Sequence, residues 1–316
     1  MNYLFFYSTV YDEVVKVEQK KIYFVELSLV VVTIIWGLGF PITDIAINIG
    51  YGANTIMVGR FLTASILLTI VYHKKLKMIN RKIMLYGIVT GLFLFAGFFF
   101  QTLGNVYTTS SKNGFITQLN IVFVPFLYFL FFRKKVDFYN IISVVIAIIG
   151  MVVLTDIISE NAVFNIGDFY TLLCAIMVAF HVVTGSYFMK KHHFDPALFV
   201  LINIYTSMVT SVIAMVLFDT YPTIEVVDLW PLLFLGVLNT ALGFLVQSYA
   251  LKASLPTRVS LIVALESVFA AIGAVLILNE TMSYSLVIGG FLILSAVLFN
   301  EVKPFKKNSK RVKEIY

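Results

Sequence analysis

The chain has 316 residues, of which 60% are hydrophobic and only 13% are charged. Soluble globular chains carry about 25% charged residues, so this composition excludes an ordinary water-soluble fold. The formal net charge of +6 would suggest a nucleic-acid partner in a soluble protein. In a membrane protein it is better explained by basic residues on the cytoplasmic side, and we expect no nucleic-acid partner.

Residues 1–21 precede the first long apolar stretch. Their apolar segment Leu4–Phe6 is too short for a cleavable signal, and no small-residue cleavage site follows it. We therefore expect a cytoplasmic leader, partly helical on the membrane surface, whose role the sequence leaves open. The single cysteine, Cys174, lies in an apolar run, which is typical of a buried side chain and allows no internal disulfide.

Ten stretches are long and apolar enough to cross a bilayer as helices, which takes about 20 residues each. Short segments join them, so consecutive helices are expected to be antiparallel neighbours. The pattern predicts an all-α integral membrane protein with ten transmembrane helices. The stretches are residues 22–48, 53–72, 83–104, 109–132, 138–157, 168–189, 195–218, 229–251, 256–278 and 281–300.

The basic residues predict the orientation of these helices. With the N-terminus in the cytoplasm, 21 of the 23 Lys and Arg residues fall on the cytoplasmic side, and only Arg60 and Lys112 do not. This asymmetry follows the positive-inside rule, so both termini are expected in the cytoplasm. The basic tail, residues 301–316, is expected to bind anionic lipid headgroups. The opposite segments are acidic and carry Asp156, Glu160, Asp168, Asp219, Glu225, Asp228 and Glu280.

The two halves of the chain align without gaps at an offset of 146 residues. A Gly-Phe-x-x-Gln motif at residues 97–101 then falls on the same motif at residues 243–247. Because each half holds five spans, an odd number, the second copy must be inverted relative to the first. Inverted repeats are typical of secondary transporters that work by alternating access. The predicted repeats are residues 22–157 and 168–300.

Several motifs resemble the drug/metabolite transporter superfamily, specifically the EamA-type ten-helix transporters. Residues 36–41 (W-G-L-G-F-P) are similar to the W-G-x-x-F pattern of that family, and Arg60-Phe61 to its R-F pair. Residues 265–271 (L-E-S-V-F-A-A) and 278–280 (L-N-E) resemble its L-E-P-V-F-A and L-G-E segments, with Ser267 and Asn279 as departures. The resemblance covers about residues 22–302. It implies a secondary carrier of small metabolites, commonly an exporter, that does not use ATP.

Polar side chains near the middle of the spans predict the transport site. Ionisable and amide groups are costly inside a bilayer and usually face a cavity or a partner. Transporter sites of this kind lie near the membrane midplane, between the repeats. The candidate substrate-binding residues are Trp36, Asn120, His181, Asn239 and Glu266.

Each candidate has a chemical role and a structural alternative. Glu266 in a low-dielectric cavity can hold a proton near neutral pH, and it could bind a proton or a substrate ammonium group but not both, as antiport requires. His181 is the second candidate for proton coupling, and Trp36 offers an apolar wall or a cation–π surface. The alternatives are hydrogen bonds between helices for the polar residues and simple packing for Trp36.

Four further residues are expected to form gates or structural contacts. Arg60 lies about 10 Å inside the outer end of its span, where we expect it to pair with Asp44, or else to form an anion-binding gate. Gln101 and Gln247 end the two copies of the repeated motif.

The function predicted from the sequence is secondary export of small amphipathic metabolites or amino acids, with proton coupling as an option. Dianionic substrates would need several cationic side chains in the cavity. Only Arg60 and Lys112 are candidates, so a dianionic substrate is not expected. The alternatives are a non-transporting partner such as a lipid-flippase subunit and, less favoured, a membrane-embedded lipid enzyme. The one His pair, His192-His193, lies in a basic loop without the spacing of a zinc site. We expect no cofactor or metal and location in a bacterial plasma membrane, and the oligomeric state stays open.

Overall fold

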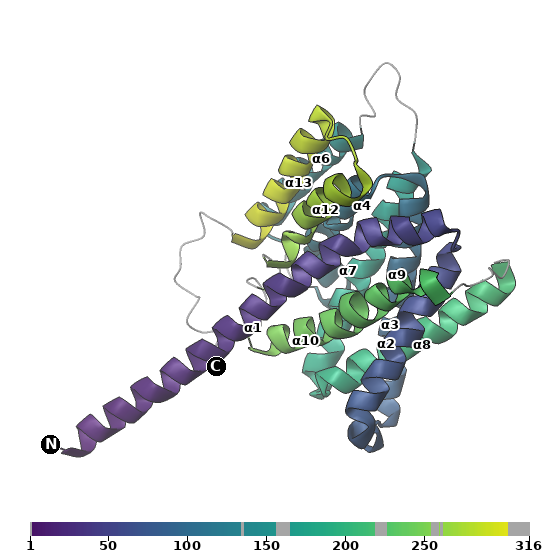
Figure 1. Cartoon of the computed structure of the whole chain (residues 1–316). Helices are drawn as coiled ribbons and strands as arrows, with labels where there is room; N and C mark the ends of the chain where they lie inside the picture. Colours follow the sequence, from purple (N-terminus) through teal and green to yellow (C-terminus); the bar gives the residue numbers. More distant parts are fainter. Residues whose placement is uncertain are drawn as a thin grey trace.

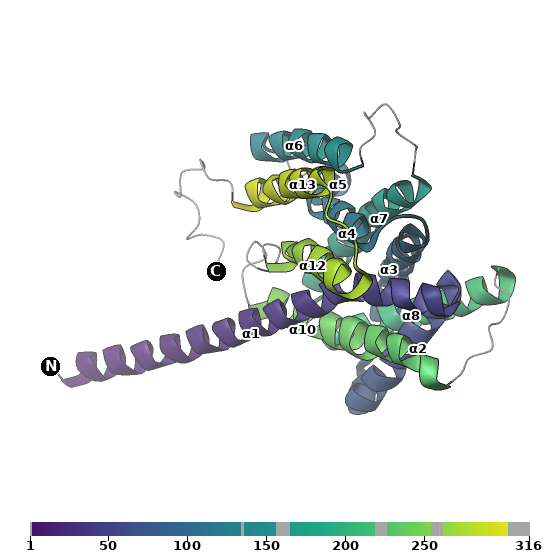
Figure 2. The same ribbon diagram turned by 45° about the horizontal axis from the view of Figure 1, so that its top comes forward.

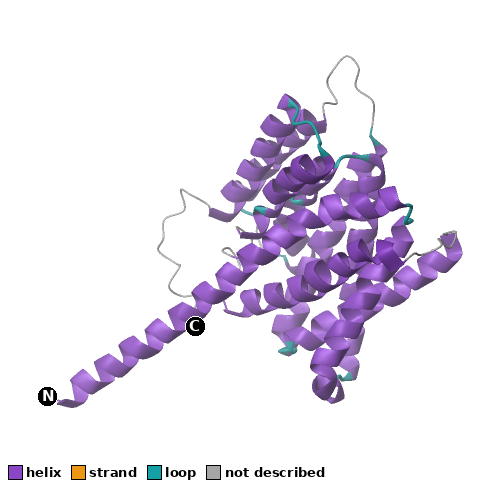
Figure 3. Cartoon of the chain, viewed as in Figure 1, coloured by secondary structure: helices purple, strands orange, loops and turns teal. Residues whose placement is uncertain are grey.

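The computed structural model describes residues 2–133, 136–155, 165–218, 226–253, 259 and 262–302, and these are helical apart from short connections (Figure 3). Eight helices are long and apolar enough to cross a membrane, and two shorter apolar helices, Ile262–Leu278 and Tyr284–Asn300, follow them. The expected all-α architecture of apolar spans is therefore confirmed.

The first half of the chain begins with a long helix that projects from the bundle at its N-terminal end (Figure 1). The residues expected to form a separate leader continue this helix without a break from Asn2. The helices of the first half are α1 (Asn2–Ile49), α2 (Ala53–Tyr72), η1 (His73–Met78), α3 (Arg81–Tyr107), α4 (Ser110–Thr117), α5 (Leu119–Phe132) and α6 (Phe138–Thr155).

The second half also begins with a long helix and ends with a shorter one. Its eighth span consists of three consecutive segments, the middle one a π-helix of 9 residues. The helices are α7 (Ile166–His192), α8 (Pro196–Phe218), η2 (Val226–Leu229), α9 (Trp230–Leu233), η3 (Phe234–Leu242), α10 (Gly243–Ala253), α12 (Glu266–Leu278) and α13 (Tyr284–Val302).

Polar side chains define several helix ends. The Asn80 side chain accepts hydrogen bonds from the backbone N–H groups of Lys82 and Ile83, both at 3.0 Å, and so caps α3. At the end of α12, Asn279 adopts the left-handed conformation with φ of 55°. Asn tolerates this conformation better than most residues with a side chain. Asn279 stands where the EamA pattern has Gly, and Gly is the other residue that commonly adopts this conformation at a helix end.

One span in each half is interrupted near its middle. Gln118 separates α4 from α5, and Leu265 directly precedes α12. The two residues have nearly the same backbone conformation, with φ and ψ of −66° and −12° at Gln118 and −69° and −12° at Leu265. They lie 147 positions apart, one residue from the offset that aligns the halves. Both interruptions lie at the level of the polar residues discussed below.

The packing between halves follows a regular pattern. Helix α3 packs against α7 and α8, and the segments η3 and α10 pack in the corresponding way against α2 and α1. Helix α2 also contacts α8, α4 contacts α12, and α6 lies beside α13 (Figure 2). If each span of one half is replaced by the corresponding span of the other half, every contact in this set becomes another contact of the set or stays the same.

Candidate functional site

Asn239, in the middle of the π-helix η3, joins three spans. Its backbone carbonyl accepts a hydrogen bond from Trp36 Nε1 at 2.7 Å, and its Nδ2 donates to the Ile35 carbonyl at 3.2 Å. Its Oδ1 accepts a hydrogen bond from Arg60 Nη2. The wider turn of a π-helix shifts which carbonyls are bonded along the helix, and π-helices often mark functional sites. Asn239 thus uses its backbone and side chain to hold α1 and α2 against the eighth span.

An aromatic cluster lies beside this junction, formed by Trp36, Phe98, His181 and Phe244. The ring centroid of Phe244 is 5.7 Å from that of Trp36, 5.9 Å from that of Phe98 and 6.1 Å from that of His181. Phe98 and Phe244 occupy the same position in the two copies of the Gly-Phe-x-x-Gln motif. The repeated motif therefore brings its two phenylalanines into contact between the halves of the molecule.

The cation of Arg60 lies in this central region and not at the outer end of the span. Only 2% of the residue is exposed, and its guanidinium carbon lies 4.2 Å from the centroid of the Phe98 ring. The expected pair with Asp44 is wrong, because Arg60 donates to Asn239 while the Asp44 carboxylate accepts from Ser110. The charged side chain that interacts electrostatically with Arg60 is Glu266.

Glu266 opens α12 directly after the interruption at Leu265. Its Oε2 accepts a hydrogen bond from Gln118 Nε2 at 3.2 Å, so the carboxylate bridges the interruptions of both halves. Arg60 and Cys174 are the other charged or titratable groups that interact with it. Glu266 lies deep among the helices, and the residue as a whole is neither fully buried nor fully exposed.

His181 and Asn120 differ in whether their hydrogen bond reaches another span. His181 Nδ1 lies 3.2 Å from the Thr90 carbonyl. A carbonyl can only accept, so in this contact Nδ1 carries the proton and Nε2 can accept a hydrogen bond from a solute. Asn120 Nδ2 donates to the Thr117 carbonyl at 2.7 Å, a contact within its own span. The structure thus places His181 in the aromatic cluster, whereas the recorded bond of Asn120 supports the helix interruption.

The two glutamines of the repeated motif, Gln101 and Gln247, are both partly exposed. The backbone carbonyl of Gln101 accepts a hydrogen bond from Asn113 Nδ2 at 2.8 Å. The glycine of the second motif has a clear packing role, because a Cβ added at Gly243 would overlap the indole ring of Trp36. The roles of the two glutamines as gate or structural residues stay predictions.

A polar layer joins the helix ends at the side of the bundle where α4 begins. Asp44 Oδ2 accepts a hydrogen bond from Ser110 Oγ at 2.6 Å, and Glu280 accepts from the Ser110 backbone at 2.9 Å and from Ser111 Oγ at 2.6 Å. The two carboxylates are thereby held at the N-terminus of α4, whose dipole favours negative charge. These contacts connect α1, α4 and the segment that follows α12.

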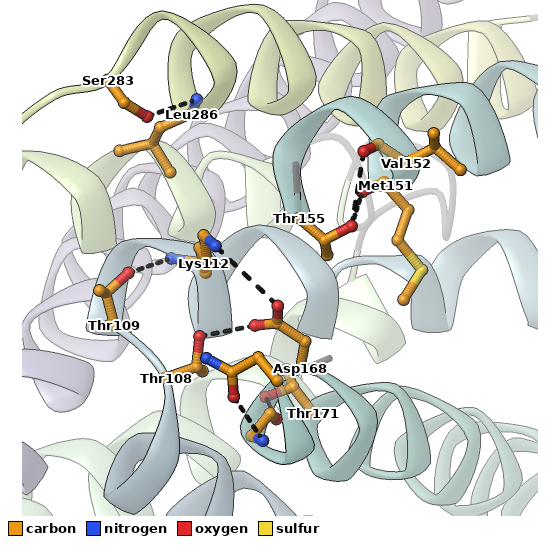
Figure 4. Close-up of polar contacts among 12 residues, drawn as sticks. Thr108, Thr109, Lys112, Met151, Val152, Thr155, Asp168, Thr171, Ser283 and Leu286 are labelled. Carbon is orange, nitrogen blue, oxygen red and sulfur yellow. Dashed lines mark hydrogen bonds and ion pairs between the residues drawn. The ribbon is translucent and has the colours of Figure 1, made fainter. Parts of the chain in front are cut away.

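A second group in the same layer links the start of α4 to α7. Figure 4 shows Thr108 and Lys112 converging on Asp168, with Thr108 Oγ1 donating at 2.6 Å and Lys112 Nζ lying 4.0 Å from the other carboxylate oxygen. Lys112, one of the two basic residues outside the predicted cytoplasmic segments, thus has an acidic partner. We refer to Asp44, Ser110, Ser111 and Glu280 with Thr108, Lys112 and Asp168 as the α4-end polar layer.

The opposite end of the bundle is joined by an ion pair and a tyrosine pair. Lys75 Nζ lies 2.7 Å from Asp195 Oδ2, and the hydroxyl oxygens of Tyr72 and Tyr249 lie 3.3 Å apart. Partial burial alone would raise the pKa of Asp195, but hydrogen bonds from Lys75 and from the first turn of α8 hold it below its usual value. Asp195 is therefore charged near neutral pH and both caps α8 and anchors the loop that follows α2.

Three residues of the central region were not among the sequence candidates. Phe98 and Phe244 had a signal in the repeated motif, but the prediction followed its glutamines. Gln118 had the same signal as Asn120, an amide side chain in the middle of its span, but the prediction named only Asn120. In the described part of the chain, no group of three His, Cys, Asp or Glu residues could hold a metal ion.

Comparisons with known proteins agree with this architecture. An uncharacterised transporter of Archaeoglobus fulgidus is 28% identical over 281 residues, which cover 88% of this chain and 86% of that protein. An uncharacterised transporter of Clostridium kluyveri is 22% identical over 210 residues, covering 64% of this chain and 67% of that protein. A crystal structure with 13% identity matches with a TM-score of 0.62 over 89% of this chain and 96% of its own, which shows a shared fold.

The strongest comparison is with a family model that matches the chain twice, over residues 24–156 and 165–301. The matched segments cover nearly all of the apolar helices, one half of the chain each. On this basis the chain belongs to the EamA-like transporter family, within the drug/metabolite transporter superfamily, and it is a multi-pass membrane transporter.

Proposed function

We propose that this transporter exports small amphipathic metabolites or amino acids by alternating access, and that Glu266 couples export to proton entry. The observation that carries the proposal is the position of Glu266. Glu266 is a partly exposed residue at the interruption of a span, and its carboxylate accepts a hydrogen bond from Gln118 at the interruption of the repeat-related span. The aromatic cluster beside this region offers an apolar surface for the body of a solute.

Alternating access is often achieved by two related halves that rock against each other, and we infer that residues 22–157 and 168–300 are inverted copies. The exchangeable packing of their helices and the contact between Phe98 and Phe244 support this relation. The distribution of basic residues supports cytoplasmic termini. The odd number of spans in each half then makes the copies antiparallel.

The polar contacts at the two ends of the bundle fit the role of alternating closures. The α4-end polar layer connects α1, α4, α7 and the segment after α12, and an outward opening must separate some of these contacts. The pair of Lys75 with Asp195 and the pair of Tyr72 with Tyr249 would separate on inward opening. Hydrogen bonds of this kind are individually weak enough to exchange during a transport cycle.

The coupling mechanism follows from competition at a single carboxylate. A deprotonated Glu266 can bind an ammonium group, and a protonated one cannot. A proton entering from outside would displace the solute outward, and release of the proton inside would prepare the site for the next solute. Arg60 and Cys174 face Glu266 and belong to the electrostatic environment in which it takes up and releases the proton.

Counterflow in proteoliposomes tests the proposal. Vesicles are loaded with a pool of labelled amino acids, amines and other small metabolites, and exchange is followed by mass spectrometry under two imposed pH gradients. We expect protein-dependent exchange that responds to the gradient, and we expect Glu266→Gln to lose that response. Glu26→Gln, which changes a carboxylate outside the central region, serves as the matched control.

Two results would contradict the proposal at different levels. Exchange by Glu266→Gln with an unchanged response to the pH gradient would remove Glu266 from the coupling mechanism. Folded protein that moves no solute under either gradient would instead favour a non-transporting role, such as a lipid-flippase subunit.

A further inference from the structure

The central region contains two opposite charges that differ in their access to solutes. Glu266 is partly accessible, whereas Arg60 is 2% exposed and enclosed by Phe98 and Asn239. Among the described residues, no carboxylate lies within ion-pair distance of the Arg60 guanidinium. Its Nε is also buried without a hydrogen-bond partner. Arg60 is therefore a fixed cation of the site that is compensated only through space, by Glu266.

This arrangement constrains the net charge that the site can accept. Arg60 and a deprotonated Glu266 together carry no net charge. A bound organic cation would leave one uncompensated positive charge in a low-dielectric region, and a bound anion would leave one negative charge. Burying an unbalanced charge is strongly unfavourable. A zwitterion adds no net charge and can orient its ammonium toward Glu266 and its carboxylate toward Arg60.

The aromatic groups of the region agree with this preference. Aromatic faces attract cations, and an open aromatic cage would favour a cationic solute. Here one face of Phe98 is already occupied by the Arg60 guanidinium, and this fixed positive charge also repels a cation from the neighbouring rings of Trp36 and Phe244. The rings of Trp36 and Phe244 remain as an apolar surface for the body of the solute.

We propose that the site selects zwitterions with an apolar body over organic cations and anions of the same shape, and that Arg60 is the specificity-determining residue. The inference rests on the proposed transport function and specifies its substrate class. Because Phe98 and Asn239 enclose Arg60, it acts through its charge, and Lys at this position should largely preserve the selection.

A charge series on one skeleton tests this inference in reconstituted full-length protein. The probes are L-phenylalanine, phenethylamine and 3-phenylpropionate, with L-leucine, 3-methylbutylamine and 4-methylpentanoate as a second series. At neutral pH these are zwitterions, cations and anions respectively. We expect wild-type counterflow to be about tenfold or more faster for each amino acid than for its amine or acid. A tenfold change in affinity corresponds to about 1.4 kcal/mol of binding free energy.

The Arg60 variants test whether its charge sets the order of counterflow rates, which a merely structural role would leave unchanged. In Arg60→Gln the site retains only the charge of Glu266, so we expect the ratio of amine to amino-acid counterflow to rise by about tenfold. Arg60→Lys should keep the wild-type order. Gel filtration and thermal unfolding show whether each variant is folded. If Arg60→Gln does not fold, the wild-type charge series still decides the question.

The possible failures are distinguishable. Wild-type protein that moves the amines or acids as fast as the amino acids overturns the zwitterion inference and leaves the transport proposal intact. The same holds if other solutes of the pool move and neither series does, or if a folded Arg60→Gln keeps the wild-type order. If no solute of any charge moves, the proposed function fails as well.

Discussion

At the scale of single residues, Asn239 joins three spans in the central region. Its backbone carbonyl accepts from Trp36, and its side chain accepts from Arg60 and donates to the Ile35 carbonyl. We predict that Asn239→Ala lowers the free energy of unfolding by about 2 kcal/mol, the typical worth of a buried hydrogen bond to a charged group. Denaturation of the purified protein in detergent measures the change.

Two variants at and beside this position serve as controls. Asn239→Asp keeps an acceptor for the Arg60 guanidinium but loses the donor to the Ile35 carbonyl, so it should be less destabilised than Asn239→Ala. Leu238→Ala truncates the neighbouring side chain, which is 36% exposed, and should have a smaller effect than Asn239→Ala. Equal losses for Asn239→Ala and Leu238→Ala would show that the polar junction does not stabilise the fold.

The sequence predicts how deep a residue lies in the membrane better than it predicts the neighbours of that residue. The polar positions in the middle of the spans could be recognised because such residues are rare in apolar helices. The partner of Arg60 could not be predicted, because the position of Arg60 along α2 does not say which other helix it faces. Asp44 lay at a suitable depth, but Asn239 and Phe98 occupy the space around the guanidinium.

At the scale of helices, glycines set how closely spans approach. A Cβ added at Gly37 would lie 2.8 Å from the backbone nitrogen of Ala270, so α1 packs directly on the backbone of α12. We predict that Gly37→Ala separates the two helices and costs about 1–3 kcal/mol, as overpacking does. Reconstituted transport should fall with it, because α12 carries Glu266.

Gly185→Ala is the matched control for this prediction. The nearest atom to an added Cβ there is Thr90 Cγ2 at 3.4 Å, an ordinary contact distance. The variant should keep wild-type stability and transport, measured by thermal unfolding and counterflow in parallel with Gly37→Ala. If both variants behave as wild type, α1 and α12 are free to separate without consequence for the site.

The positions of the spans could be predicted from hydropathy, because lipid requires long apolar helices. Their internal irregularities could not. The residues at the two interruptions, Gln118 and Leu265, are neither Pro nor Gly, and the π-helix around Asn239 contains one glycine, Gly236. These irregularities depend on hydrogen bonds to other spans, such as the bond between Gln118 and Glu266, which a single stretch of sequence does not contain.

At the scale of the whole molecule, the order of the helices and the distribution of charge make one topological prediction. Helices connected by short loops must alternate in direction, so the segment after α2 and the start of α13 lie at opposite ends of the bundle. The segment after α2 is basic, with Lys74, Lys75 and Lys77, whereas the start of α13 follows Glu280. The positive-inside rule then places the former in the cytoplasm and the latter outside.

Single-cysteine labelling tests this topology with little background, because the native Cys174 has 0% exposure. We predict that a membrane-impermeant maleimide labels Tyr284→Cys in intact cells, since Tyr284 is 90% exposed at the start of α13. Lys77→Cys, also at an exposed position, should be labelled only after the membrane is permeabilised. The unmodified chain should not be labelled under either condition. Labelling of Lys77→Cys alone in intact cells would reverse the orientation, and with it the direction in which the α4-end polar layer opens.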